Sequence, residues 1–167
     1  RGALGGLSLP FVTGGRSSAR FTALGGGPDF DALVASASDL IEAGRFRFPG
    51  RVSEVMDHYD SAHAGVLLST CGEGLSNSIM EYMAGGLPVL CTDQGGNREL
   101  VLDGVTGFLI PPSDADTLAE KLLWLEENRE KALAMGRAGR ERIETEFSLA
   151  RMTQRAGEIY AEALAGR

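Results

Sequence analysis

Short apolar runs alternate with longer amphipathic stretches along most of the chain. The apolar runs are four or five residues long and lie at 21–24, 65–69, 88–91 and 107–110. Phe46 and Phe48 alternate with arginines, which predicts a further strand closed by Pro49-Gly50. Short apolar strands separated by helices are typical of a parallel sheet that is buried on both faces. We therefore predict an α/β fold, an open parallel sheet with helices on both faces.

Helices are predicted between and after these strands from capping residues and from apolar positions three or four residues apart. The first begins at Asp29 or Asp31 and ends at Gly44. Further helices are predicted at 52–59, at 76–84, behind a cap at Ser113 or Asp114, at 132–144 and at 149–164. Residues 1–20 are rich in Gly and Ser and show no clear periodicity of apolar residues. We expect an irregular N-terminal segment there.

Charge and cysteine content narrow the class of protein. The 167 residues carry a net charge of −7, which argues against nucleic acid as a partner, because such a partner needs a basic face. A single phosphate site stays compatible with that charge, since backbone N–H groups can bind an anion. The number and spacing of Cys71 and Cys91 match neither a disulfide framework nor a metal-binding motif. We therefore expect both to be small, half-buried thiols in a reducing cytoplasm.

The stretch STCGEGLSNSIMEYMAGG, residues 69–86, joins an apolar strand to a predicted helix. Ser76 and Asn77 are favourable N-cap residues, and Gly74 lets the backbone come close to a ligand. The free N–H groups and the positive end of the helix dipole suit a diphosphate. A plain strand-to-helix turn is the alternative interpretation of these glycines.

Two glutamates in this stretch point to sugar hydroxyls. A carboxylate beside a phosphate is repelled, so Glu73 needs another partner, and an ionised carboxylate accepts strong hydrogen bonds from hydroxyls. Glu81 lies roughly 8 Å from the start of the helix, and helical side chains lean toward that start. It can therefore reach a ribose diol while a diphosphate lies at the helix end. These features together predict a nucleotide-sugar site, although a solvated surface acid remains the alternative for Glu81.

These residues, in this order, resemble retaining glycosyltransferase family 4. The resemblance runs from about 21 to 164 and rests on the spacing E-x7-E between Glu73 and Glu81, with "LGGGPD", "FPGRV", "TDQGGNREL" and "DGVTGFLIPP" around it. The family has two Rossmann-like domains in the GT-B arrangement, and this chain resembles the C-terminal, donor-binding one. The resemblance implies a hexosyltransferase-type enzyme of polysaccharide biosynthesis. Such an enzyme moves a sugar from a UDP- or GDP-sugar to a cell-surface glycan or glycolipid, with retention of configuration.

The resemblance also assigns roles to individual residues. Glu73 is expected to be the catalytic residue and to hold hydroxyls of the donor sugar, and Glu81 to bind the ribose. Residues 74–77 are expected at the diphosphate, 50–52 at the nucleobase and 95–97 along the cleft. The implied donor site consists of Glu73, Gly74, Leu75, Ser76, Asn77, Glu81, Gly50, Arg51, Val52, Gly95, Gly96 and Asn97.

The resemblance divides the chain into an irregular segment at 1–20, a nucleotide-sugar-binding Rossmann-like domain at 21–146 and a C-terminal helix at 147–167. That helix would cross to an absent N-terminal domain, which would bind the glycan or lipid-linked acceptor, so we expect the isolated half to be inactive. The full-length protein is expected to be cytoplasmic, in keeping with peripheral association at the inner face of the cell membrane. The Arg and Lys that the family places before 21 have no match here.

We expect no cofactor and no metal, because the nucleotide-sugar is a substrate. The two D-x-D triplets, at 29–31 and 114–116, open predicted helices and are interpreted as caps, while His58 and His63 lack a third ligand. Two alternative functions stay open. One is an NAD-type dinucleotide-binding oxidoreductase, since G-x-G-x-x-N at 72–77 nearly matches that fingerprint. The other is a non-catalytic nucleotide-sugar-binding fragment.

Overall fold

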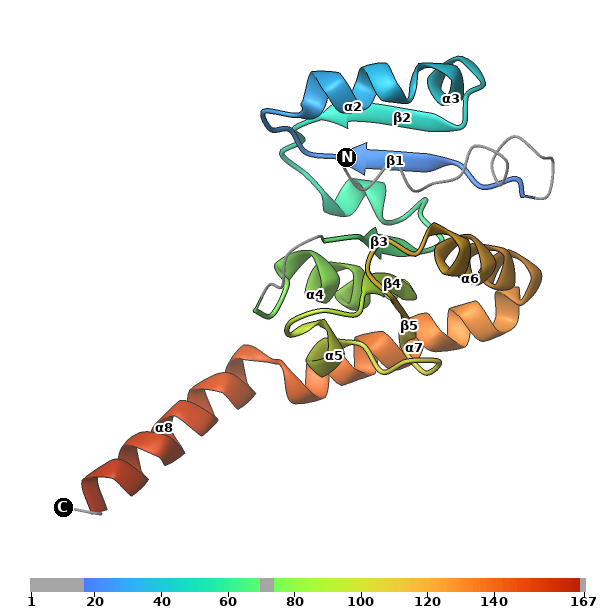
Figure 1. The fold of residues 1–167 in the computed structure, drawn as a ribbon. Coiled ribbons are helices and arrows are strands. Elements are labelled where there is room, and N and C mark those ends of the chain that lie inside the picture. The colour runs from blue at the N-terminus through green and yellow to red at the C-terminus, as the bar shows by residue number, and fades with distance from the viewer. Residues whose placement is uncertain (1–16, 70–73, 166–167) are drawn as a thin grey trace.

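A computed structural model describes residues 17–69 and 74–165 and places five parallel strands among helices (Figure 1). The strands are β1 (Phe21–Leu24), β2 (Phe46–Gly50), β3 (Gly65–Leu67), β4 (Val89–Thr92) and β5 (Gly107–Ile110). The helices are α2 (Phe30–Ser36), α3 (Ser38–Glu42), α4 (Asn77–Ala84), α5 (Asn97–Leu100), α6 (Ala115–Glu127), α7 (Arg129–Glu146) and α8 (Leu149–Ala165), with a 3-10 turn η2 at Met56–His58. The predicted α/β class is confirmed.

Hydrogen bonds group the described strands into two parallel sheets, β1-β2 and β3-β4-β5, rather than into one. Figure 1 shows β1, rather than β2, on the side of the larger sheet. Among the described residues, no strand pairing joins β1 to β3. The smaller sheet and α3 pack on helix α6, where Phe46 of β2 and Leu40 of α3 meet Ala119.

Strand β4 is buried on both faces of the larger sheet. Leu90 packs against α6 and α7, together with Phe108 and Ile110 of β5. Val89 and Cys91 point the other way, against α4 and α5. All three β4 side chains have 0% exposure, and burial raises the pKa of Cys91 to about 12. This thiol is therefore fully buried in the core, rather than half-buried as predicted from the sequence, and it packs as a small apolar side chain.

Two helix predictions need correction. The predicted helix between Asp29 and Gly44 is broken at Ala37, where the Ser36 hydroxyl donates to the Leu33 carbonyl at 2.8 Å. Such a bond competes with the helical backbone pattern. Asp29 holds the N-cap position of α2 but makes no capping hydrogen bond through its side chain. At 52–59 only η2 forms, and the valines, serine, aspartate and histidine of this segment have weak helix propensity.

Helix α6 begins as predicted. The carboxylate of Asp114 accepts from the backbone N–H of Thr117 at 2.9 Å and from its hydroxyl at 2.6 Å. These bonds hold the pKa of Asp114 below its usual value. The second D-x-D triplet is therefore a helix cap.

Residues 17–20 run into β1 without regular structure and are tied by hydrogen bonds to α6 and to Arg45, the residue before β2. The Ser17 hydroxyl donates to Glu126 Oε2 at 2.7 Å, and Arg45 Nη2 donates to the Ser17 carbonyl at 2.7 Å. Hydrogen bonds from Ser18 and Ser17 lower the pKa of Glu126.

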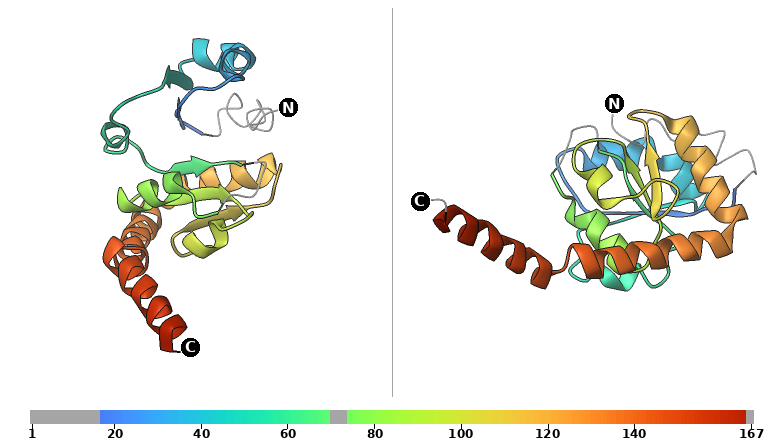
Figure 2. Two further views of the ribbon diagram at one scale, coloured as in Figure 1. Left: turned by 90° about the vertical axis from the view of Figure 1, so that its left-hand side faces the viewer. Right: turned by 90° about the horizontal axis from the view of Figure 1, so that it is seen from below.

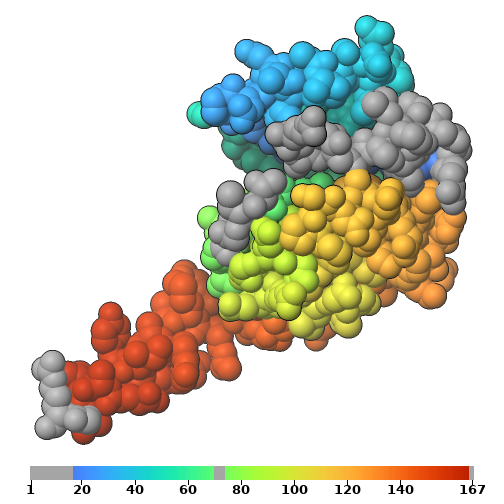
Figure 3. All heavy atoms as spheres, in the orientation of Figure 1, coloured from blue at the N-terminus to red at the C-terminus, as the bar shows by residue number. Residues whose placement is uncertain are grey.

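Helix α8 projects from the rest of the described chain, as Figures 2 and 3 show. None of its residues is buried. Its large apolar side chains are more than half exposed, namely Leu149, Met152, Ile159, Tyr160 and Leu164. No helix among the described residues is both long and apolar enough to cross a membrane.

Helix α7 approaches the α4–β4 turn closely at Gly136. A Cβ added there would lie 1.9 Å from the Gly86 carbonyl oxygen. We predict that Gly136→Ala destabilises the fold by about 1–3 kcal/mol through overpacking, measured as a lower urea midpoint. Gly157→Ala is the matched control, because no atom lies within 4 Å of a Cβ added at that α8 position. It should be neutral or stabilising by up to about 1 kcal/mol. Equal midpoints for the two variants would contradict the prediction.

Candidate functional site

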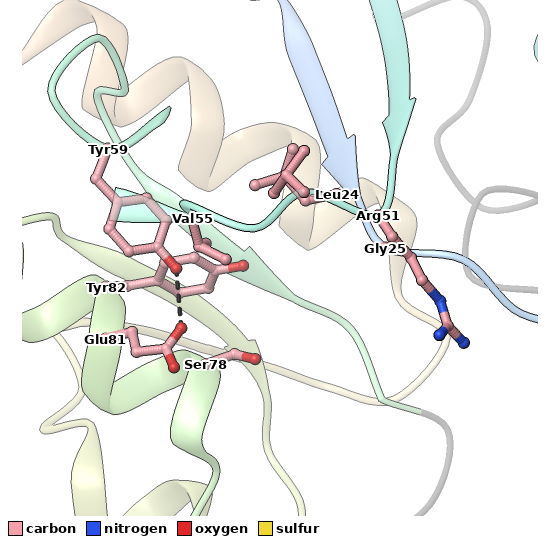
Figure 4. Close-up of a pocket in the computed structure, with 9 residues that line it drawn as sticks. Leu24, Gly25, Arg51, Val55, Tyr59, Ser78, Glu81 and Tyr82 are labelled. Carbon is pink, nitrogen blue, oxygen red and sulfur yellow. Dashed lines mark hydrogen bonds between the residues drawn. The ribbon is translucent and has the colours of Figure 1, made fainter. Parts of the chain in front are cut away.

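A pocket of about 300 Å³ lies where β1 and β2 end and helix α4 begins its second turn (Figure 4). Ligands of open α/β sheets bind at the carboxyl ends of the strands, and this pocket has that position. It is lined by Leu24, Gly25, Arg51, Val52, Val55, Tyr59, Ser78, Glu81 and Tyr82.

Glu81 reaches the pocket because α4 is anchored from its opposite face. Ile79 and Met83 have 0% exposure and pack in the core beside β4. Glu81 falls between these two on the helix and is exposed. Its Oε2 accepts a hydrogen bond from the Tyr59 hydroxyl at 3.1 Å, which Figure 4 shows as a dashed line. The structure thus places this predicted site residue in the pocket.

Two tyrosines form the wall beside Glu81. The rings of Tyr59 and Tyr82 meet edge to face with centroids 5.4 Å apart. The Tyr82 ring lies on Gly65, where an added Cβ would come within 2.3 Å of it. Burial, the hydrogen bond to Glu81 and the charge of that carboxylate raise the pKa of Tyr59. Burial, followed by the charge of Glu81, raises the pKa of Tyr82. Both hydroxyls therefore stay protonated over the ordinary pH range.

The predicted nucleobase segment lies on the far side of the pocket. Gly50 has a φ of 78°, which favours glycine, and its carbonyl accepts from Gly25 N at 2.8 Å, so the ends of β1 and β2 are joined. Arg51 and Val52 follow and line the pocket. Figure 4 shows the Arg51 side chain directed away from Glu81. The guanidinium therefore leaves the space between the acid and the strand ends open.

The residues predicted to bind the diphosphate, 74–77, lead into the first turn of α4. Ser76 holds the N-cap position with extended backbone and is 5% exposed, but its side chain makes no capping hydrogen bond. The capping role expected of its hydroxyl is therefore absent. Gly74, Leu75 and Asn77 are exposed around it. The N–H groups at the start of this helix remain the donors that an anion could use.

The loop after β4 lies beside the start of α4. A Cβ added at Gly96 would lie 2.6 Å from the Gly74 carbonyl oxygen, so two predicted segments meet here. Asn97 is 1% exposed, and its Nδ2 donates to the Thr92 carbonyl at 2.8 Å within the turn. Its Oδ1 and the Oε1 of Gln94 are buried without a hydrogen-bond partner among the described residues.

Glu73, the predicted catalytic residue, and Cys71 lie outside the described residues. The sequence interpretation missed the tyrosines, Leu24, Gly25, Val55 and Ser78 as pocket residues. Tyr59 lies 22 residues before its partner Glu81, so no short sequence pattern indicated its place in the pocket. In the described ranges, no group of three or more His, Cys, Asp or Glu side chains is placed to hold a metal ion.

Parallel strands with a pocket at their carboxyl ends are the arrangement by which open α/β domains bind ligands. The sequence model of the family described as "Glycosyl transferases group 1" matches residues 14–142. The chain belongs to this family. Membership of this family decides against the dinucleotide-binding oxidoreductase as the function of the domain.

Known proteins of similar sequence and structure agree with this family. A GDP-mannose-dependent alpha-(1-6)-phosphatidylinositol monomannoside mannosyltransferase of Mycobacterium tuberculosis is 31% identical over 150 residues, covering 84% of this chain and 38% of the relative. The chain thus spans about two fifths of the length of that relative. The crystal structure of Anabaena Alr3699/HepE in complex with UDP has a TM-score of 0.79 at 23% identity, covering 86% of this chain and 41% of that one.

The chain is also similar to a solved structure of a single domain. The C-terminal domain of a glycosyl transferase group 1 family protein (LpcC) from Francisella tularensis has a TM-score of 0.64 at 22% identity. The match covers 74% of this chain and 66% of that one. At these identities the two solved structures support the GT-B type of fold.

We predict that Glu81 binds a ribose diol. Loss of a hydrogen bond to a charged group costs roughly 1.5–3 kcal/mol, about ten- to a hundredfold in affinity. Glu81→Ala should weaken nucleoside diphosphate binding by that order in calorimetric titrations, while a 2′,3′-dideoxy analogue should bind wild type and variant alike. Glu141→Ala, an exposed helical glutamate on α7, is the control and should leave binding unchanged. Equal losses for both ligands would contradict the assignment.

Proposed function

We propose that this chain is the C-terminal, donor-binding domain of a retaining glycosyltransferase of family 4, and that it binds a UDP- or GDP-sugar. One observation carries the proposal: an exposed carboxylate on α4 and the ends of β1 and β2 line one pocket, beside the N-terminus of the same helix. A nucleotide offers base, ribose and phosphates in that order. The site offers strand ends, Glu81 and helix N–H groups in the same order.

Relatives support a nucleotide donor. The Mycobacterium relative is named for GDP-mannose, and the Anabaena structure contains UDP. The space between Arg51 and Glu81 has room for a base and ribose, because the pocket measures about 300 Å³ and the Arg51 side chain points away. Gly95, Gly96 and Asn97, beside Gly74, would then lie next to the transferred sugar.

The proposed chemistry uses no protein nucleophile. Glu73 would hold hydroxyls of the donor sugar, while the N–H groups at the start of α4 stabilise charge on the leaving diphosphate. The leaving phosphate would help deprotonate the acceptor on the same face of the sugar, which accounts for retention. A metal ion is not part of this proposal.

Helix α8 would complete the enzyme. Its exposed apolar side chains, Leu149, Met152, Ile159, Tyr160 and Leu164, recur at spacings that place them along one side of the helix. We propose that this side packs on an N-terminal domain that binds the glycan or lipid-linked acceptor.

A thermal-shift panel tests the donor. GDP, UDP, ADP and their common sugar conjugates are each added to the 167-residue chain. A ligand at a hundred times its Kd stabilises the folded state by about 2.7 kcal/mol. We expect a clear rise in melting temperature with UDP or GDP compounds and less with ADP compounds. No rise with any nucleotide would overturn the proposed function.

We predict that Glu73 recognises the sugar and not the nucleotide. In the full-length enzyme, Glu73→Ala should cut turnover strongly while the bare nucleoside diphosphate binds as well or more tightly, since an anion near the phosphates is removed. Turnover and calorimetric affinity are compared with those of Glu130→Ala, an exposed control on α7. Much weaker binding of the bare diphosphate to a folded variant would refute this role.

We predict that the isolated chain binds donor but transfers no sugar. Alignment of acceptor and donor between two domains can supply roughly 7–11 kcal/mol of barrier reduction, which one domain alone cannot provide. The chain is incubated with radiolabelled sugar nucleotides and candidate acceptors, and the full-length protein serves as the positive control. Transfer by the isolated chain at a rate near that of the full-length protein would rule out the half-enzyme interpretation.

A further inference from the structure

The Glu81 carboxylate is held by a residue from another part of the chain. Tyr59 lies on the segment that joins β2 to β3, 22 positions before Glu81, and donates its hydroxyl proton to Oε2 at 3.1 Å. The tyrosine is 8% exposed, whereas the glutamate is exposed. A buried donor therefore reaches out to an acid at the surface of the pocket (Figure 4).

The position of the Tyr59 hydroxyl is fixed by packing on several sides. The ring meets Tyr82 edge to face, and its Cδ2 would lie 3.5 Å from a Cβ added at Gly85. Its backbone N–H donates to the Met56 carbonyl at 2.9 Å, and its carbonyl accepts from Ala62 N at 3.0 Å. The hydroxyl thus has a defined place before any ligand binds.

The hydrogen bond leaves the acid with enough acceptor capacity for a diol. An ionised carboxylate has two oxygens with about four lone-pair sites. Tyr59 uses one site on Oε2, so Oε1 and the second site on Oε2 remain for two neighbouring hydroxyls. An exposed glutamate otherwise samples many rotamers, and ordering it on binding lowers affinity. The bond to Tyr59 orders it beforehand.

We propose that Tyr59 is a positioning residue that holds the Glu81 carboxylate ready to accept both hydroxyls of a ribose, and that it thereby favours ribonucleotides over nucleotides without the diol. This inference rests on the proposed function and adds to it a residue that acts through Glu81. Because burial and the neighbouring carboxylate raise the pKa of Tyr59, its hydroxyl stays a donor at the pH of any ordinary assay.

The test is a double-mutant cycle on the 167-residue chain. Wild type, Tyr59→Phe, Glu81→Ala and the double variant are titrated by calorimetry with GDP, UDP and their 2′,3′-dideoxy counterparts. Phenylalanine keeps the packed ring and removes only the donor. Tyr160→Phe is the matched control, since it removes a hydroxyl from a side chain that is 72% exposed on α8.

We expect Tyr59→Phe to weaken ribonucleotide binding roughly three- to tenfold, the effect of one lost hydrogen bond. Dideoxynucleotide binding should not change, and in the Glu81→Ala background the same substitution should have no effect. Tyr160→Phe should match wild type.

Three results would overturn the inference. Equal losses for ribo- and dideoxynucleotides would show a merely structural role for Tyr59. Unchanged ribonucleotide binding in Tyr59→Phe, with a clear loss in Glu81→Ala, would show that Glu81 needs no positioning, and the proposed function would stand. Absence of nucleotide binding by wild type would overturn the proposed function and this inference with it.

Discussion

Strand β4 has no face toward solvent, and most of the described structure follows from that constraint. Val89, Leu90 and Cys91 are fully buried, with neighbours in two different helical layers. A strand of this kind needs β3 and β5 as neighbours in the sheet and a helix on each face. Each connection from one parallel strand to the next therefore crosses over a face of the sheet. The carboxyl ends of the parallel strands then all lie along the same edge of the sheet. Helix α4 begins near that edge, after β3, and brings Glu81 into the pocket.

The same constraint sets the position of the acid. Helix α4 is fixed from within by Ile79 and Met83, and from behind by α7, where Gly136 lets the two backbones approach. Glu81 is therefore carried by a rigid element rather than by a loop. A site built on such elements holds its geometry better than one built on loops alone. The remaining freedom of the glutamate lies in its own side chain, and there Tyr59 acts.

Residue spacing and side-chain type along the sequence predicted those parts of the fold that depend on neighbouring residues in the chain. The strands at 21–24 and 107–110, the Asp114 cap and the place of Glu81 on a helix all follow from spacing and side-chain type. The break at Ala37 was missed because a serine hydroxyl competes with the helix there. The division into two sheets and the Tyr59–Glu81 contact were also missed. Both depend on groups that are far apart in sequence, and no short pattern encodes them.

The two sheets are separate ladders of backbone hydrogen bonds among the described residues, and this has a consequence for how the domain opens. They are joined by side-chain packing on Ala119 and by hydrogen bonds to Glu126. No hydrogen-bonded pair of described strands connects them. We expect such parts to open as distinct cooperative units, so that their amide hydrogens exchange with solvent at two different free energies of opening. In the proposed binding mode, a nucleotide touches the end of β2 with its base and α4 with its ribose. It therefore bridges both units, and its binding should slow exchange most in whichever unit opens more easily.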